Sequence, residues 1–311
     1  MLKARYELSR ATPGSIQRAI RLFEEAAQLD PDYSSAYAGL VHALVLDVLW
    51  GFTAPEDTRG YAREASELAL AHNAENPEAI SAAAAYQLIY EWNVEGTMEL
   101  VAGAPGSPDL DDDLRVMKGL ALLAQGRLDD AAHELGRASD VAPQIPFRRY
   151  LVALVAFFSG RDDESLRVLD TLDELAPDFA LSAALRSSVL SNRGEFAAAD
   201  AALDSFRRLT NDSTVFGLAA TGVVDARSGR RDDALAVVEM LRDASYPRYV
   251  PPALIARVLI ALGEYDAALD ELARAKSERS LPILVLASDP DFEPLRGDAR
   301  FAALLEGLGG R

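Results

Sequence analysis

The side chains that most often carry catalysis or hold metals are scarce in this sequence of 311 residues. It has no cysteine, which excludes disulfides, thiolate metal sites and cysteine nucleophiles. Its only histidines are His42, His72 and His133. His133-Glu134 begins like the His-Glu-x-x-His helix of zinc enzymes, but no second histidine follows at the required spacing, and one imidazole cannot hold zinc. We therefore expect no metal site and no cofactor.

Acidic pairs are abundant, but their spacing argues against acid–base catalysis. Three of them recur about one repeat or two apart: Asp129-Asp130, Asp162-Asp163 and Asp232-Asp233. A periodic pair is better explained as the first turn of a helix, where the helix dipole favours negative charge. The runs Asp109–Asp113 and Asp289-Pro-Asp291 lack the glycine and final glutamate of a calcium loop, so we interpret them as helix starts or solvated loops.

Motifs for nucleotide or acyl chemistry are missing as well. The sequence has neither a Gly-x-x-x-x-Gly-Lys phosphate loop nor a Gly-x-Ser-x-Gly nucleophile turn. These observations together predict a protein that is not an enzyme.

The charge balance restricts the partners. Asp and Glu number 49 against 31 Lys and Arg, a net charge of −18, which disfavours direct binding to nucleic acid or to an anionic membrane. The segment Met1–Arg10 is charged and has no apolar signal region, and the longest apolar run, Tyr150–Phe158, is far shorter than the about 20 residues of a membrane span. We expect a cytoplasmic protein. An acidic outer face would favour a basic partner, although solubility alone explains the charge equally well.

A repeat of about 34 residues organises most of the chain. Five glycines lie 34, 34, 35 and 34 residues apart, and each is followed five residues later by a small residue; the glycines are Gly126, Gly160, Gly194, Gly229 and Gly263. In the copy that starts at Gly126, the small residue is Ala131, and Pro143 follows twelve residues after it. Glycine favours the positive φ that ends a helix, alanine allows two helices to cross closely, and proline stands at a helix start. Each unit is therefore predicted to be a helical hairpin that buries its apolar stripe against the next copy.

This pattern resembles the tetratricopeptide repeat, whose unit is a pair of antiparallel helices. The resemblance implies an all-α fold: a right-handed α-solenoid of about eight hairpins that forms a single domain over residues 1–311. About twelve extra residues fall in Val48–Asp57, and Gly, Pro and Ser cluster in 102–110, as a long loop or as a hinge. Residues 281–311 break the period and are predicted to cap the last hairpin.

A narrower resemblance depends on both ends of the chain. Its motifs are Arg5–Pro13, Ala36–Leu40, Tyr90–Asn93 and Asp289–Phe292. They resemble the repeat regions attached to bacterial winged-helix regulators, adenylate cyclases and receptor-like serine/threonine kinases. In such proteins the array senses or recruits, and another domain supplies the output.

In a tetratricopeptide superhelix the first helices of successive hairpins line the concave face. By register with the repeat, the candidate groove residues are His42, Tyr150, Phe157, Asn192, Arg227 and Arg257. An apolar peptide is expected to lie near Tyr150 and Phe157, with the two arginines meeting a carboxylate. The alternative is that the aromatic residues pack between helices and the arginines are solvated.

The sequence thus favours a non-catalytic scaffold of a bacterial signalling system that binds a protein or peptide segment. One alternative is the regulatory part of a larger enzyme or transcriptional regulator whose output domain is absent from this chain. Another is a groove that senses a small molecule. The sequence does not indicate an oligomeric state.

Overall fold

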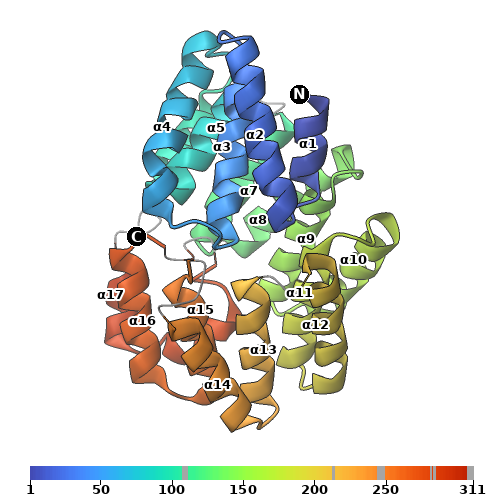
Figure 1. Cartoon of the computed structure of the whole chain (residues 1–311), viewed down its shortest axis with the longest axis vertical. Helices are drawn as coiled ribbons and strands as arrows, with labels where there is room; N and C mark the ends of the chain where they lie inside the picture. The colour runs from blue at the N-terminus through green and yellow to red at the C-terminus, as the bar shows by residue number, and fades with distance from the viewer. Residues whose placement is uncertain (107–110, 212–213, 244–248, 281, 283–284, 307–311) are drawn as a thin grey trace.

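The computed structural model describes residues 1–106, 111–211, 214–243, 249–280, 282 and 285–306. Within these ranges the chain forms seventeen α-helices and one 3₁₀ helix, and no strand is present (Figure 1). The predicted all-α architecture is confirmed.

The first sixteen helices pair in chain order into eight hairpins among the described residues. The pairs are α1 (Leu2–Ser9) with α2 (Pro13–Leu29), α3 (Ser34–Leu49) with α4 (Pro55–His72), α5 (Pro77–Ile89) with α6 (Val94–Ala102), α7 (Asp112–Ala124) with α8 (Leu128–Val141), α9 (Pro146–Phe158) with α10 (Asp162–Leu175), α11 (Ala180–Asn192) with α12 (Phe196–Thr210), α13 (Val215–Arg227) with α14 (Arg231–Arg242), and α15 (Pro252–Leu262) with α16 (Tyr265–Ser277). A 3₁₀ helix, η1 (Pro290–Leu295), and α17 (Ala299–Leu305) follow. The eight pairs agree in number with the about eight hairpins predicted from the repeat.

The repeat residues act as predicted. Gly126 has a φ of 73°, and the four glycines in phase with it also have positive φ, so each turn between paired helices uses the left-handed region that favours glycine. Ala131 is fully buried between the helices of its hairpin. In the next copy Ser165 replaces alanine and remains satisfied, because its hydroxyl donates to the carbonyl oxygen of Ala153 at 2.9 Å.

Close helix packing also depends on Gly119. A Cβ atom at this position would lie 2.5 Å from Cγ of Leu135 on the paired helix α8, which is closer than van der Waals contact allows. Glycine at this position therefore allows α7 and α8 to pack closely.

We expect Gly119→Ala to lower the free energy of unfolding by about 1–3 kcal/mol, because Leu135 must move in a packed core. Gly136→Ala on α8 is the matched control, since a Cβ there meets nothing within 4 Å. That change should raise stability by up to about 1 kcal/mol through helix propensity. Urea denaturation followed by circular dichroism measures both, and equal effects of the two substitutions would contradict the packing argument.

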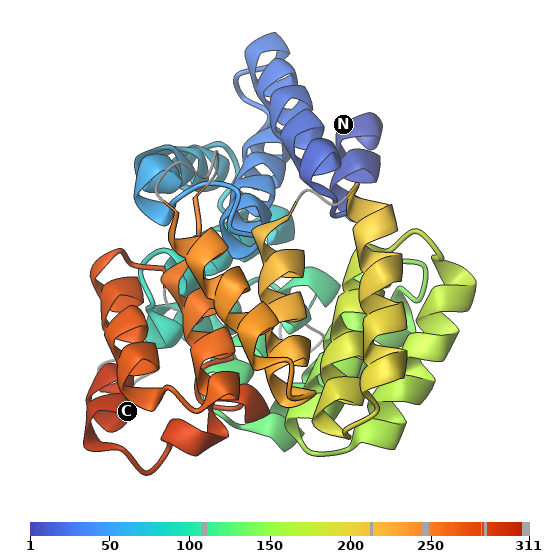
Figure 2. The ribbon, with the colours of Figure 1, turned by 60° about the horizontal axis from the view of Figure 1, so that its bottom comes forward.

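The hairpins wind so that the second and third hairpins of the solenoid contact the eighth. Figure 1 shows the α3–α4 hairpin close to the C-terminal helices, although α4 ends at His72 and α15 begins only at Pro252. Arg279 after α16 donates to the carbonyl oxygen of Tyr90 after α5, and a Cβ on Gly51 after α3 would lie 2.6 Å from Pro251 before α15. The superhelix therefore curls back on itself and surrounds much of its concave face (Figure 2).

The last hairpin is covered by η1 and α17. Phe292 and Phe301 are buried there, with ring centroids 6.4 Å apart. Residues 281, 283–284 and 307–311 of the predicted cap lie outside the described residues, as do residues 107–110 of the predicted loop or hinge. Among the described residues, none of the helices combines the length and apolar character that a membrane crossing requires.

Candidate functional site

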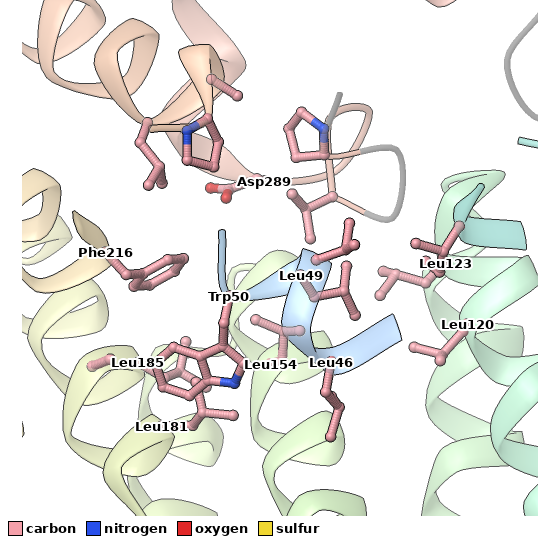
Figure 3. Close-up of a pocket in the computed structure, with 18 of the residues that line it drawn as sticks. Leu46, Leu49, Trp50, Leu120, Leu123, Leu154, Leu181, Leu185, Phe216 and Asp289 are labelled. Carbon is pink, nitrogen blue, oxygen red and sulfur yellow. The ribbon is translucent and has the colours of Figure 1, made fainter. Parts of the chain in front are cut away.

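The concave face contains a cavity of about 250 Å³ (Figure 3). It exists because the inner helices separate in the middle of the solenoid. Helices α3 and α5 pack along each other, as do α13 and α15, whereas α9 makes few contacts with α11 and hardly touches α7. The side chains of α7, α9 and α11 therefore face a shared space rather than one another.

The cavity lining is dominated by aliphatic and aromatic side chains. They come from six inner helices (α5, α7, α9, α11, α13 and α15), from the end of α3 and from the segment after α16; they include Leu46, Leu49, Trp50, Ile89, Leu120, Leu123, Tyr150, Leu154, Phe157, Leu181, Leu185, Phe216, Leu254 and Val285. The site thus combines residues from both halves of the chain.

The side chain of Trp50 lines the cavity from a segment outside the repeat helices. Trp50 follows α3 in the predicted twelve-residue extension, and Figure 3 shows its ring beside Leu181 and Leu185 of α11 and near Phe216. Trp50 is 3% exposed, and its ring stacks on Phe52 and Phe206 at centroid distances of 5.8 and 6.1 Å. The extension therefore places an aromatic side chain inside the concave face of the solenoid.

A buried ion cluster lies at one edge of the cavity. Arg257 of α15 contacts Asp289 at 2.7 Å and also pairs with Asp291, and Arg227 of α13 contacts Asp291 at 2.7 Å. Both aspartates are buried. Burial works to raise the pKa of Asp291, but Arg257 and Arg227 outweigh it and hold the pKa below its usual value. Burial raises the pKa of Asp289 to about 6, against the effect of Arg257.

A second, smaller cavity of about 40 Å³ adjoins the first on the side of α11. Both are lined by Ser188, Phe216, Leu254 and Arg257, so they are neighbours. Ser187 and Ser191 also line the smaller cavity. Their hydroxyls are buried and have no hydrogen-bond partner among the described residues.

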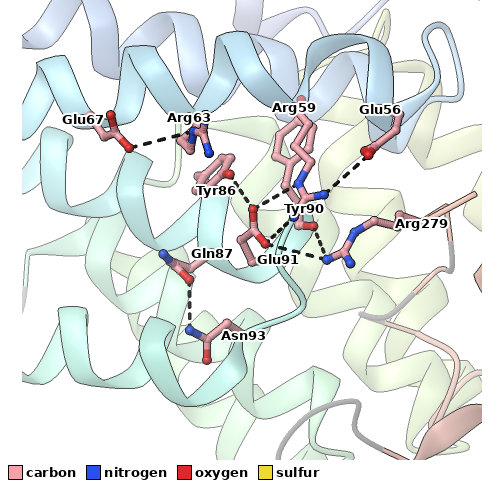
Figure 4. A network of polar contacts seen from close by, with 10 residues as sticks. All are labelled: Glu56, Arg59, Arg63, Glu67, Tyr86, Gln87, Tyr90, Glu91, Asn93 and Arg279. Atoms are coloured by element: carbon pink, nitrogen blue, oxygen red, sulfur yellow. Dashed lines mark hydrogen bonds and ion pairs between the residues drawn. The ribbon is translucent and has the colours of Figure 1, made fainter.

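A polar network holds the closed arrangement together (Figure 4). Glu91, just after the C-terminal end of α5, pairs with Arg59 of α4 at 2.7 Å and lies 3.8 Å from Arg279. The guanidinium of Arg279 also lies over the ring of Trp92, 4.9 Å from its centroid. Hydrogen bonds from Arg59 hold the pKa of Glu91 below its ordinary value, against burial, which raises it.

We expect Glu91→Gln to lower the free energy of unfolding by about 1–2 kcal/mol at pH 7, because two arginines lose their carboxylate. Since the folded-state pKa of Glu91 is lowered, its contribution is present above the unfolded pKa near 4.5 and is lost as the pH falls through the folded value. The difference between wild type and variant should therefore shrink below pH 4.5. Glu67→Gln is the control, because Glu67 makes only an exposed contact of 4.0 Å with Arg63. A pH-independent difference in urea denaturation would contradict this role.

The structure brings three of the six predicted groove residues to the cavity. Tyr150, Phe157 and Arg257 line it, and Arg227 joins Arg257 through their shared partner Asp291. Tyr150 is half-buried, and burial raises the pKa of its hydroxyl to about 12. Phe157 is 1% exposed. The carboxylate that meets the two arginines is supplied here by the chain itself.

The other two predicted residues lie elsewhere. Nε2 of His42 is 3.3 Å from the hydroxyl of Ser81, and burial lowers the pKa of this histidine. Asn192 is exposed at the C-terminal end of α11. Neither residue lines either cavity.

Sequence reasoning missed the residues that close the site: Trp50, Arg279 and the pair Asp289 and Asp291. Asp289 does start a helix, as interpreted, since its side chain accepts the N–H of Asp291 at 2.9 Å. However, neither aspartate is solvated. The available signals were an aromatic Trp-Gly-Phe sequence inside the extension and an arginine on each of two successive inner helices. Among the described residues, no group of His, Asp and Glu side chains is arranged to hold a metal ion.

Comparisons with solved structures identify the fold of the chain. The APC/C hetero-tetramer Cut9–Hcn1 superimposes on 97% of this chain and 54% of its own, with a TM-score of 0.67 and 12% identity. A human IFIT1 dimer with PPP-AAAA superimposes with a TM-score of 0.62 on 85% of this chain and 69% of its own, at 12% identity. PilF of Pseudomonas aeruginosa superimposes with a TM-score of 0.50 on 75% of this chain and 96% of its own, at 16% identity. The fold is that of tetratricopeptide-repeat proteins, and the predicted right-handed α-solenoid is confirmed.

One group of curated sequences is also similar, although no family model matches the chain. The transcriptional regulator HilA of Salmonella typhimurium is 20% identical over 268 residues, which cover 85% of this chain and 47% of HilA. The HilA sequences of Salmonella typhi and Salmonella paratyphi A match to the same extent. The chain therefore spans about half the length of the curated relatives it matches.

Proposed function

We propose that this chain is a non-catalytic, cytoplasmic interaction module of a bacterial regulatory system, and that it binds an apolar segment of a partner protein on its concave face. The observation that carries the proposal is the separation of α7, α9 and α11, whose side chains face a shared space. Trp50 already occupies part of that space, so the chain's own extension is an example of the apolar aromatic segment that the site accepts.

The arginines supply the polar part of the proposed site. Asp291 holds Arg227 and Arg257 through charge-assisted hydrogen bonds, and a carboxylate of the partner would take its place. The partner segment is therefore expected to combine apolar residues with an acidic one. A protein partner, rather than nucleic acid or a membrane, is favoured by the net charge of −18.

Site-specific photocrosslinking tests this function. A benzoylphenylalanine at Tyr150 should capture a defined partner in cells, whereas the same residue at Leu175, 60% exposed and absent from the cavity lining, should not. Tyr150→Ala combined with Arg257→Met and Asp289→Asn removes the ring and one arginine and leaves Asp291 paired with Arg227. This triple variant should weaken binding of the purified partner at least tenfold. Capture at Leu175 alone, or unchanged affinity of the triple variant, would exclude the concave face as the binding site.

The similarity to HilA favours a second candidate: the chain is the regulatory part of a transcriptional regulator whose output domain lies outside it. HilA is about twice as long as the matched region, which leaves room for such a domain in that protein. The reading frame around the gene tests this candidate directly. A DNA-binding domain encoded in the same frame supports it, and stop codons on both sides of these 311 codons exclude it.

A further inference from the structure

The central cavity is large enough for a molecule that the chain does not itself provide. An apolar cavity of about 150 Å³ holds benzene, so about 250 Å³ accommodates roughly ten non-hydrogen atoms. The lining is formed chiefly by leucine and aromatic side chains, which favour an apolar occupant through burial of its surface. We propose that this cavity binds a compact, uncharged and mostly apolar small molecule that carries one hydrogen-bonding group.

The hydrogen-bonding group is assigned to the side of α11. The hydroxyls of Ser187 and Ser191 are buried and have no partner among the described residues, although a buried hydroxyl normally makes a hydrogen bond. Each serine is at most 2% exposed, and both line the small cavity that adjoins the large one at Ser188. A hydroxyl or carbonyl at one end of the ligand satisfies these groups while its body fills the apolar space.

The charges at the site favour a neutral molecule. The arginines at the site are paired with carboxylates of the chain: Arg227 and Arg257 with Asp291 and Asp289, and Arg279, which also lines the cavity, with Glu91 at 3.8 Å. While Asp291 stays in place, neither a small anion nor a small cation finds an uncompensated counter-charge, and each would lose its hydration on entry. The site therefore selects against charged analogues of the same size.

Binding is coupled to closure of the solenoid. The cavity is lined by Trp50 and Leu49 from the first half of the chain and by Arg279 and Val285 from the segment after α16. A molecule that contacts both groups binds the closed arrangement in preference to an open one, so it stabilises that arrangement by mass action. A small molecule bound in the cavity would thereby control how far the solenoid is closed.

The experiment uses 2-naphthol, a neutral fused-ring alcohol of eleven non-hydrogen atoms, titrated into the full chain by isothermal calorimetry. We expect one saturable site per chain and a rise in melting temperature with ligand concentration. The anion 2-naphthalenesulfonate should bind at least tenfold more weakly. Ala184→Phe on α11 places a ring in the cavity and should weaken 2-naphthol at least tenfold. Ala201→Phe on the exposed face of α12 adds the same ring outside the cavity and should leave the affinity unchanged.

The polar end has its own test. The double variant Ser187→Ala and Ser191→Ala should weaken 2-naphthol roughly three- to tenfold but leave naphthalene, which has no hydroxyl, unaffected. If Ala184→Phe does not fold, Leu154→Trp blocks the same space from α9. No saturable binding at about 1 mM ligand, or equal affinities for wild type and the cavity-filling variant, would overturn the proposal. Capture of a protein partner is measured without 2-naphthol, so the ligand site and the protein-binding function can fail independently.

Discussion

Replacing Trp50 with alanine is expected to lower the free energy of unfolding by about 3–5 kcal/mol. The indole is 3% exposed and stacks on Phe52 and Phe206, and its centroid lies 6.0 Å from that of Phe216. Its removal would enlarge a cavity that already exists, because the surrounding helices α9 and α11 are held apart and cannot collapse onto the gap. Urea denaturation monitored by circular dichroism measures the loss without depending on tryptophan fluorescence.

The same substitution also tests whether Trp50 joins the two halves of the chain. Solenoids unfold as sums of neighbouring units, and Trp50 is a contact between units that are far apart in sequence. We therefore expect the single transition of the wild type to separate into two in Trp50→Ala. Leu49→Ala is the control one residue away, since Leu49 is 40% exposed and should cost less than about 1 kcal/mol. Equal losses in the two variants would show that Trp50 does not join the halves.

The local architecture was predictable because each repeat contains the residues that determine its own turn and its own helix crossing. A glycine such as Gly126 specifies the turn between two helices through its positive φ, and Ala131 specifies where they cross. These rules act within about 34 residues, so the sequence predicted the hairpins and their order. Register with the repeat also identified Tyr150, Phe157 and Arg257 as inward-facing residues.

Closure of the solenoid was not predictable from the same rules. It depends on small rotations between successive hairpins that accumulate along the chain, and no residue pattern records their sum. Trp50 lies in an extension with no repeat register, so its place between Phe206 and Phe216 has no periodic signal. Asp291 lies 64 residues from Arg227 in the chain. The sequence alone does not show that these two residues meet, so an aspartate in a capping segment is expected to be solvated.

Arg257→Ala is expected to lower the free energy of unfolding by about 3–5 kcal/mol at pH 7.5, because it leaves buried carboxylates without their main counter-charge. Asp289 is 1% exposed and Asp291 is 5% exposed, and only Arg227 would remain to pair with Asp291. Burial raises the pKa of Asp289 to about 6 even with Arg257 present. Without the guanidinium, the folded-state pKa rises further above the unfolded value of 3.8, so folding takes up a proton as the pH falls. The loss should therefore be smaller at pH 5 than at pH 7.5.

Two further variants separate charge from packing in this cluster. Arg257→Met combined with Asp289→Asn leaves Asp291 paired one to one with Arg227, and the amide oxygen of the introduced asparagine can still accept the backbone N–H that starts η1. We expect this double variant to recover at least half of the lost stability, because no unpaired charge remains buried. Arg300→Ala removes an exposed arginine that pairs with Asp266 and Asp298 at the surface, and it should leave the stability almost unchanged. If Arg257→Ala were as mild as Arg300→Ala, or if its effect did not change with pH, the cluster would not hold the capping segment against α15.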